Sequence, residues 1–284
     1  MSARARGGPR ERAAPERPRR GSDLGRRIVF AIPAIAFALA IVLSGGAIFA
    51  AGLILLGVIA LRELYQLMRR SKPIDLGGYL AIAAMVLLAT FSEREDILIA
   101  MVAAFPVVFL LALTRARLDN VAWGIAATML GVTWVGLALS HAVFLRALEH
   151  GEGLLLGVLV GTFLGDTAAY AGGRVYGRRL LAPDISPNKT VEGLVAGLVG
   201  GTLAFWAAGL YMDWLGGWEA LAIGFLVALA APLGDLFESA LKRDLEVKDT
   251  GSLMGPHGGV LDRLDAVFFT VVVGYYAALA FGYG

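Results

Sequence analysis

The sequence predicts an all-α fold, a polytopic bundle of about nine transmembrane helices. Hydrophobic residues fill 58% of the 284 positions, whereas ordinary soluble domains are about 45–50% apolar. The mean hydropathy is +0.72. From residue 28 onward, apolar runs near the ~20 residues needed to cross a bilayer alternate with short polar breaks. We therefore expect an integral membrane protein.

The apolar runs place the membrane crossings along the chain. In chain order, the expected spans are residues 28–45, 47–64, 76–91, 97–113, 121–145, 154–173, 191–211, 218–238 and 262–281. An odd number of crossings puts the two termini on opposite sides of the membrane.

The first 27 residues differ in composition from the rest of the chain. They carry nine arginines among Pro, Gly, Ser and Ala, and they hold almost nothing that could form a core. This composition is typical of a disordered basic tail that contacts anionic lipid. Nucleic-acid binding is not expected, because no aromatic or structured context accompanies the arginines. We divide the remainder into N-terminal membrane helices that act as a scaffold, residues 28–150, and a C-terminal catalytic membrane region, residues 151–284.

The distribution of positive charge orients the bundle. With the N-terminal tail in the cytoplasm, every Lys and Arg except Arg94 and Arg146 falls in the tail or at loops on the same side. Cytoplasmic loops of membrane proteins carry such an excess of Lys and Arg. We therefore expect the protein in the cell (inner) membrane, with its N-terminus and its active site on the cytoplasmic side.

The sequence contains no cysteine and three histidines. The absence of cysteine excludes disulfides, thiolate catalysis, iron–sulfur clusters and Cys-based zinc sites. Three scattered histidines argue against a multi-histidine metal centre. Any bound metal should therefore be a hard cation held by carboxylate oxygens.

Three places in the C-terminal half break the apolar pattern, and the first surrounds Asp166, inside the sixth expected span. A charged carboxylate in a membrane helix costs about 2.5–3.5 kcal/mol, so Asp166 should face the bundle interior and have a partner. Tyr170 and Gly173 follow on the same helical face, and Gly173 permits close approach of a ligand. Plain helix packing, with Asp166 as a structural polar contact, is the alternative.

The second place is the loop of residues 183–193, PDISPNKTVEG. Ser186 and Pro187 separate the two helices, and Lys189 offers a cation. The hydroxyl of Thr190 lies where the next span begins. A helix N-terminus beside a lysine is a ready anion site, because its first N–H groups lack partners. A simple connector with capping residues is the alternative.

The third place, residues 232–265, holds the densest charges of the chain. A continuing helix would put its first polar residues on one side, with carboxylates one turn deeper than cations. These residues are Asp235, Glu238, Ser239, Lys242 and Arg243.

Further along the third place, Asp262 and Asp265 stand one turn apart at the start of the last span, with Arg263 between them. Together with Asp235 they could converge on a hard cation such as Mg²⁺. Lys242, Arg243, Lys248 and Arg263 would surround that cation and bind phosphate. Such a site suits phosphoryl or nucleotidyl transfer. Lys and Arg side chains at helix ends, paired with acids, are the alternative.

Two long motifs then point to a known family. Residues 239–251 read S-A-L-K-R-x4-K-D-x-G, and residues 257–265 read H-G-G-V-L-D-R-L-D. This pattern closely resembles the phosphatidate cytidylyltransferase family, also called CDP-diacylglycerol synthase. The upstream blocks D-x-x-A-Y-x-x-G-R-x-x-G, from Asp166, and I-S-P-N-K-T-x-E-G, from Ile185, are similar to the family's other hallmark segments.

The resemblance implies a membrane enzyme that makes CDP-diacylglycerol and pyrophosphate from CTP and phosphatidic acid. It implies Mg²⁺ and leaves room for a second, monovalent ion such as K⁺; a homodimer is left open. The expected metal ligands are Asp235, Asp262 and Asp265. The expected catalytic residues are Asp235, Lys242, Arg243, Lys248, Asp249, Asp262, Arg263 and Asp265. The expected substrate-binding residues are Asp166, Tyr170, Ser186, Lys189, Thr190, Ser239, His257, Gly258 and Gly259.

The chain departs from the family pattern at two points. Gly255-Pro256 stands where the family usually has Pro-Gly, and Ala266 stands where it usually has Ser. These changes affect the turn that carries His257 and a hydroxyl near the carboxylates. Two other functions remain open, a membrane transporter or ion channel and a related CTP-dependent lipid enzyme, because charges inside spans also mark ion pathways.

Overall fold

The computed structural model describes residues 20–247, 250–251 and 258–284, with side chains from residue 32 onward. The N-terminal half forms α1 (Arg20–Ser44), α2 (Gly46–Leu67), the short 3₁₀ turn η1 (Arg69–Ser71), α3 (Asp75–Phe91), α4 (Asp96–Leu113), α5 (Val121–Gly131), the π-helical turn η2 (Val132–Gly136) and α6 (Leu137–Ala147). The C-terminal half forms α7 (Gly151–Tyr176), β1 (Leu180–Ala182), β2 (Ser186–Thr190), α8 (Val191–Gly209), α9 (Gly217–Asp244) and α10 (Leu261–Ala280).

The all-α membrane fold is confirmed. Each expected span corresponds to a helical segment, with α5, η2 and α6 forming the fifth one together. In the described part of the chain, seven segments are long and apolar enough to cross a membrane. The other two are α3, with 17 residues, and the stretch of α1 from Ile32 to Ser44, both apolar but shorter. A helix of 17 residues lies at the lower end of the range of about 17–25 residues that cross a bilayer.

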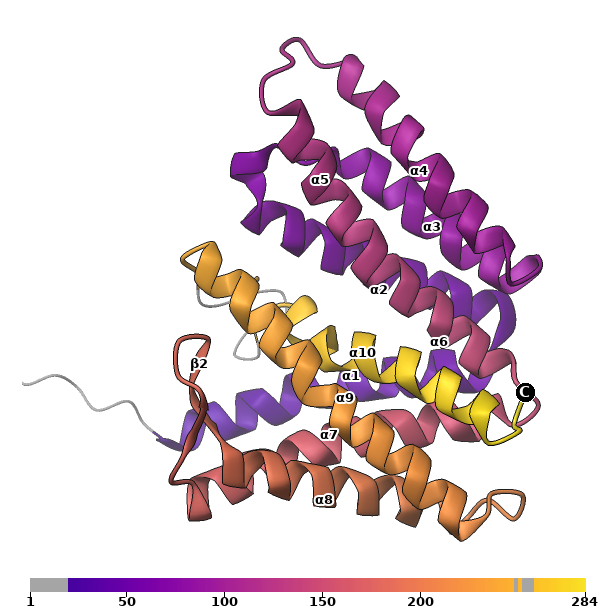
Figure 1. Ribbon diagram of the computed structural model, residues 1–284, viewed down its shortest axis with the longest axis vertical. Coiled ribbons are helices and arrows are strands. Elements are labelled where there is room, and N and C mark those ends of the chain that lie inside the picture. The colour runs from indigo at the N-terminus through magenta and orange to yellow at the C-terminus, as the bar shows by residue number, and fades with distance from the viewer. Residues whose placement is uncertain (1–19, 248–249, 252–257) are drawn as a thin grey trace, which may run out of the picture.

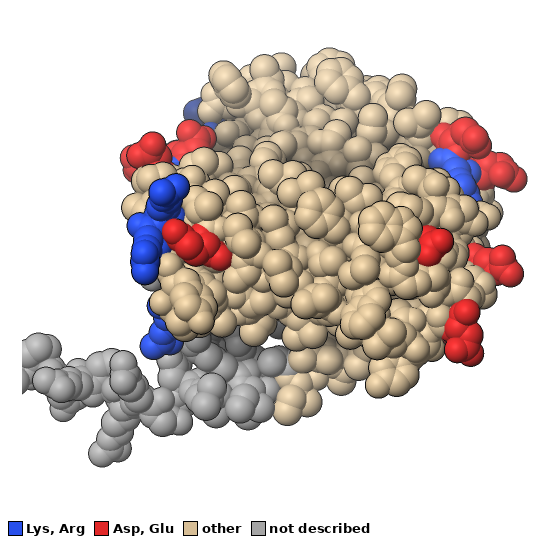
Figure 2. Space-filling model, turned by 60° about the horizontal axis from the view of Figure 1, so that its bottom comes forward, with Lys and Arg blue, Asp and Glu red and all other residues tan. Residues whose placement is uncertain are grey.

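The charges lie at the two ends of the bundle. The connections α2–α3, α4–α5, α7–α8 and α9–α10 lie at one end, on the left of Figure 1, and the C-terminus lies at the other. In Figure 2, Lys and Arg gather at one edge and Asp and Glu prevail at the opposite edge, with a broad uncharged band between them. This band is the surface that a bilayer would cover.

Small residues hold the C-terminal helices close together. α7 and α8 pack along faces rich in glycine, where a Cβ atom added to Gly165 would lie 3.2 Å from the Cα of Gly201. Such contacts are typical of membrane helices, in which close backbone packing replaces the hydrophobic drive. α9 packs on both α8 and α10, and α10 in turn contacts α6 and α2 of the N-terminal half.

The loop of residues 183–193 is more ordered than a simple connector. β1 and β2 pair antiparallel, with Leu180 opposite Thr190 and Ala182 opposite Ser186. The hairpin leads directly into α8, whose first turn is capped by the Thr190 hydroxyl, which accepts from the Gly193 amide at 3.1 Å. Thr190 therefore opens the helix, as the sequence predicts.

Candidate active site

A cavity of about 990 Å³, lined by both apolar and charged residues, lies among α7, β2, α8, α9 and the start of α10. Its lining residues on β2, at the end of α9 and at the start of α10 belong to segments toward the left of Figure 1, the side where Lys and Arg gather in Figure 2. All three predicted places contribute to it, although they are separated in the sequence. The predicted site residues that line it are Asp166, Tyr170, Lys189, Thr190, Asp235, Lys242, Gly258, Asp262, Arg263 and Asp265.

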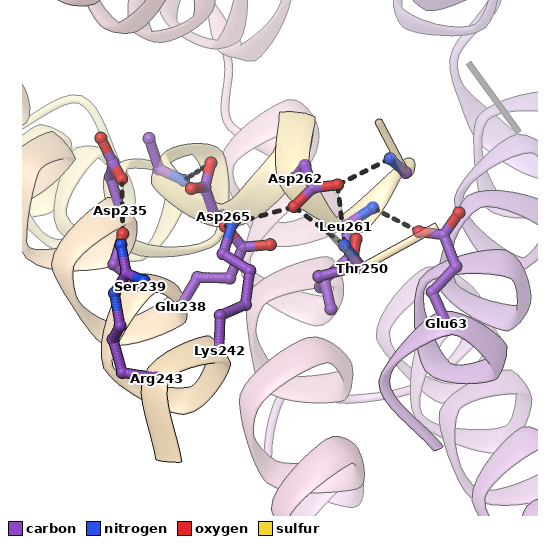
Figure 3. A network of polar contacts seen from close by, with 12 residues as sticks. Glu63, Asp235, Glu238, Ser239, Lys242, Arg243, Thr250, Leu261, Asp262 and Asp265 are labelled. Atoms are coloured by element: carbon purple, nitrogen blue, oxygen red, sulfur yellow. Dashed lines mark hydrogen bonds and ion pairs between the residues drawn. The ribbon is translucent and has the colours of Figure 1, made fainter. Parts of the chain in front are cut away.

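One face of α9 carries a ladder of polar groups (Figure 3). The helix continues to Asp244, so residues spaced three and four apart stack along its axis. The Ser239 hydroxyl donates to Asp235 Oδ1 at 3.3 Å, and the Lys242 ammonium donates to Glu238 Oε2 at 2.8 Å. The predicted arrangement, with carboxylates one turn deeper than cations, is thus present.

Asp262 joins α9 to two described segments of the connection to α10, residues 250–251 and 258–260 (the loop ends). Its Oδ1 accepts from Lys242 Nζ at 2.9 Å, and its Oδ2 accepts from the amides of Thr250 at 3.1 Å and Gly259 at 2.7 Å. Both oxygens are therefore engaged, and the carboxylate is almost fully enclosed. These contacts make Asp262 an organising group of the site (Figure 3).

Lys189 connects the hairpin to α9. Its Nζ lies 2.5 Å from Asp235 Oδ2, so the cation predicted from the loop meets the carboxylate predicted from the helix. Arg243 also binds the hairpin, since its Nε donates to the carbonyl oxygen of Ile185 at 3.1 Å. One cation from β2 and one from α9 thus fix β2 and its turn against α9.

A cluster of carboxylates lies deeper in the site. Asp166 and Asp265 each lie close enough to Asp235 for their negative charges to repel. The side chains of Glu238 and Asp265 are within hydrogen-bonding reach of each other. The buried Glu238 Oε1 has no hydrogen-bond donor among the described residues. Two ionised carboxylates in contact require a proton or a cation between them.

The donor chemistry of this cluster fits a hard cation. All of its ligand atoms are carboxylate oxygens, which are the donors that Mg²⁺ prefers. The orphaned Glu238 oxygen and the crowded negative charges of Asp235 and Asp265 are the features that a cation would satisfy. Among the described residues, no three carboxylate side chains are close enough together to bind one metal ion.

Some predicted residues lie elsewhere. Ser186, Ser239, Arg243 and Gly259 are not among the described residues that line the cavity, although Ser239 and Gly259 bind carboxylates that do line it. Three other predicted residues, Lys248, Asp249 and His257, lie outside the described part of the chain.

Sequence reasoning missed Glu63, on α2, as part of this site. Its side chain is 6% exposed, and its Oε2 accepts from the backbone amide of Leu261 at 2.8 Å. A signal was available, because a carboxylate near the end of an apolar span is costly and needs a partner. The partner could not be found from the sequence, because it lies 198 positions away.

Comparison with known proteins points to one family. The model of the cytidylyltransferase family matches residues 25–281. A phosphatidate cytidylyltransferase of Staphylococcus haemolyticus is 32% identical, over 86% of this chain and 95% of its own length. Phosphatidate cytidylyltransferase 4, chloroplastic, of Arabidopsis thaliana is 33% identical, over 92% of this chain and 74% of its own length. The phosphatidate cytidylyltransferase of Mycobacterium leprae is 35% identical over 58% of this chain. This match covers about half, 53%, of that relative's own length.

Proposed function

The chain belongs to the cytidylyltransferase family, and from this premise we propose that it condenses CTP with phosphatidic acid. The products are CDP-diacylglycerol and pyrophosphate, and the reaction is Mg²⁺-dependent and takes place at the cytoplasmic surface of the membrane. The observation that carries the proposal is a single cavity at the end of the bundle rich in Lys and Arg, which holds both buried carboxylates and lysines.

The lining of the cavity suits one substrate from the bilayer and one from water. Phosphatidic acid keeps its acyl chains in the bilayer and its phosphomonoester at the surface, whereas CTP arrives from water. The cavity wall has apolar side chains on α8 and α9, including Leu194, Leu198 and Ala231, and charged side chains toward the end of the bundle. A lipid phosphate and a nucleotide triphosphate would meet where these two linings join.

The reaction transfers a cytidylyl group. An oxygen of the phosphatidate phosphate attacks the α-phosphorus of CTP in line, the bond between the α-phosphorus and its bridging oxygen breaks, and pyrophosphate leaves with that oxygen. A phosphate dianion is already a nucleophile, so a dedicated general base is not required. Catalysis then rests on positioning and on offsetting negative charge.

The cationic side chains of the cavity can offset the negative charge of the phosphates. Lys189 and Lys242 line the cavity from β2 and α9, and Arg263 lines it from α10. They would bind the triphosphate and stabilise the charge that develops on the leaving pyrophosphate. Thr190 and the first turn of α8 add a hydroxyl and backbone N–H groups beside Lys189, which suits a phosphate.

The deeper carboxylates would hold the metal. Asp235 and Asp265 are the proposed ligands, because their negative charges lie close together in the cavity lining, with Asp166 and Glu238 beside them. Asp262 is the third predicted ligand, and its Oδ1 would have to leave Lys242 to reach the ion. When bound, Mg²⁺ would supply positive charge to the transferring phosphate.

The proposed orientation puts the N-terminus and the cavity in the cytoplasm of a cell whose inner membrane holds the protein. The clustering of Lys and Arg at the cavity end of the bundle supports it, because cytoplasmic loops carry this excess. A site at this face is also the one that cytosolic CTP can enter directly.

One assay tests the proposal. Purified protein is incubated with CTP labelled in the cytosine ring, phosphatidic acid and Mg²⁺, and the lipid phase is analysed. The proposal predicts a lipid-soluble cytidine product that requires phosphatidic acid. Folded protein that gives no such product with phosphatidic acid, or that gives one only with another lipid acceptor, would overturn it.

A further inference from the structure

The buried carboxylate of Glu63 connects the N-terminal helices to the catalytic half of the chain. Glu63 lies near the end of α2, and its Oε2 accepts from the amide of Leu261, the first residue of α10, at 2.8 Å (Figure 3). The amide of Val260 also hydrogen-bonds this carboxylate. The first N–H groups of a helix lack partners within the helix, so a carboxylate placed there fixes where the helix begins.

Glu63 also packs against both ends of the loop before α10. A Cβ atom added to Gly251 would lie 2.6 Å from Glu63 Oε1, and one added to Gly259 would clash with Glu63 Oε2. Glycine at these two positions therefore leaves room for the carboxylate. The loop ends can approach α2 this closely only because neither carries a side chain.

The same loop ends are held from the other side by Asp262, which accepts from the amides of Thr250 and Gly259. Glu63 and Asp262 thus contact the same two backbone segments, residues 250–251 and 258–261. Asp262 in turn binds Lys242, and Asp265 follows one turn later along α10. The position of both aspartates in the cavity depends on where α10 starts.

We propose that Glu63 is a positioning residue for cytidylyl transfer. By fixing the first residue of α10 and the loop ends, it sets the places of Asp262 and Asp265 relative to Lys242. This inference rests on the proposed function. It assigns to the N-terminal half a contribution to the site beyond that of a scaffold.

The test compares Glu63→Gln and Glu63→Ala with a matched control on the same helix. Tyr65 is buried like Glu63, and its hydroxyl donates to the carbonyl oxygen of Thr128 at 3.0 Å on α5. Tyr65→Phe therefore removes one buried side-chain hydrogen bond two residues away, between α2 and α5. A loss that came only from a weakened bundle would appear in this control as well.

Positioning predicts a defined pattern of kinetic constants. We expect kcat to fall roughly 10- to 100-fold in Glu63→Ala, because small misplacements of catalytic groups cost this much. Glu63→Gln keeps one oxygen acceptor and should recover part of the loss, and the KM for phosphatidic acid should change by about twofold or less. Tyr65→Phe should keep its kcat. Full activity in both Glu63 variants, or an equal loss in Tyr65→Phe, overturns the proposal.

A second readout does not depend on the reaction. Amide hydrogen exchange of peptides covering residues 250–266 should be faster in both Glu63 variants and unchanged in Tyr65→Phe. Unchanged exchange in Glu63→Gln and Glu63→Ala overturns the proposal, whether or not the wild type makes a lipid product. An inactive wild type with faster exchange in the variants would instead overturn the proposed function alone.

Discussion

Lys242 on α9 donates to Asp262 on α10 at 2.9 Å, and this ion pair joins the two helices in the wall of the cavity. The lysine also contacts Glu238 one turn below, so a single ammonium serves two enclosed carboxylates. The pair further connects to the loop ends through Asp262. The arrangement explains how charges that are costly at a membrane edge can persist there.

Lys242→Met should therefore abolish activity and destabilise the protein. The substitution keeps the apolar stem but leaves Glu238 and Asp262 enclosed without their cation, which costs about 3 kcal/mol. Cytidylyl transfer should fall more than ~100-fold, and Tm should drop in detergent. The control is Lys72→Met, which removes an exposed ion pair with Asp119 at the same end of the bundle and should change Tm little, because solvent screens an exposed pair. Equal effects of the two variants would contradict this account of Lys242.

Arg243→Ala should behave differently from Lys242→Met, although the two residues are neighbours. Arg243 is exposed and binds the backbone of the hairpin turn at Ile185. Its loss should loosen the hairpin and raise the KM for CTP about two- to tenfold, with a smaller change in kcat. Steady-state kinetics with CTP as the varied substrate measures both constants. A collapse of kcat with unchanged KM would place Arg243 among the catalytic groups.

Gly201→Val should weaken the packing of α7 on α8. A Cβ atom at Gly201 would lie 2.9 Å from the carbonyl oxygen of Gly161 and 3.0 Å from the Cβ of Ala228. Since backbone cannot give way as a flexible side chain can, we expect a loss of about 1–3 kcal/mol. Thermal unfolding in detergent measures it. Gly217→Ala serves as the control, because the nearest atom there is Trp206 Nε1 at 3.9 Å; an equally large loss in the control would argue against a packing effect.

Removal of divalent metal should stop turnover without unfolding the bundle. The helices pack through apolar and glycine contacts, so EDTA should abolish activity while Tm changes little. Added Mg²⁺ should restore activity, and Asp265→Asn should require a higher Mg²⁺ concentration for any turnover that remains, since it removes one charged oxygen ligand. Activity that persists in metal-free protein would contradict the proposal that these carboxylates bind a catalytic metal ion.

The helices and the polar face of α9 could be predicted from the sequence for simple reasons. Apolar runs of span length identify membrane helices, and a period of three to four residues puts Asp235, Ser239 and Lys242 on one side of a helix. Both kinds of pattern are local. They required no knowledge of which helices are neighbours.

The remaining parts of the site depend on contacts between distant segments. Glu63 reaches Leu261 only because α2 packs on α10, and no local pattern encodes that pairing. The same holds for Lys189, which meets Asp235 through the β1–β2 hairpin, and for Arg243, whose direction depends on where the hairpin turn lies. The residue types were thus predictable, whereas their partners required the folded structure.

The central claim is tested most directly by following the phosphates of CTP. With phosphatidic acid and Mg²⁺, label from [α-³²P]CTP should enter the lipid phase, and label from [γ-³²P]CTP should remain in water as pyrophosphate. Asp235→Asn should lose this transfer while its Tm stays close to that of the wild type. Label from the γ-phosphate in the lipid phase, or full transfer by Asp235→Asn, would contradict the account of this site as a cytidylyltransferase centre built around Asp235.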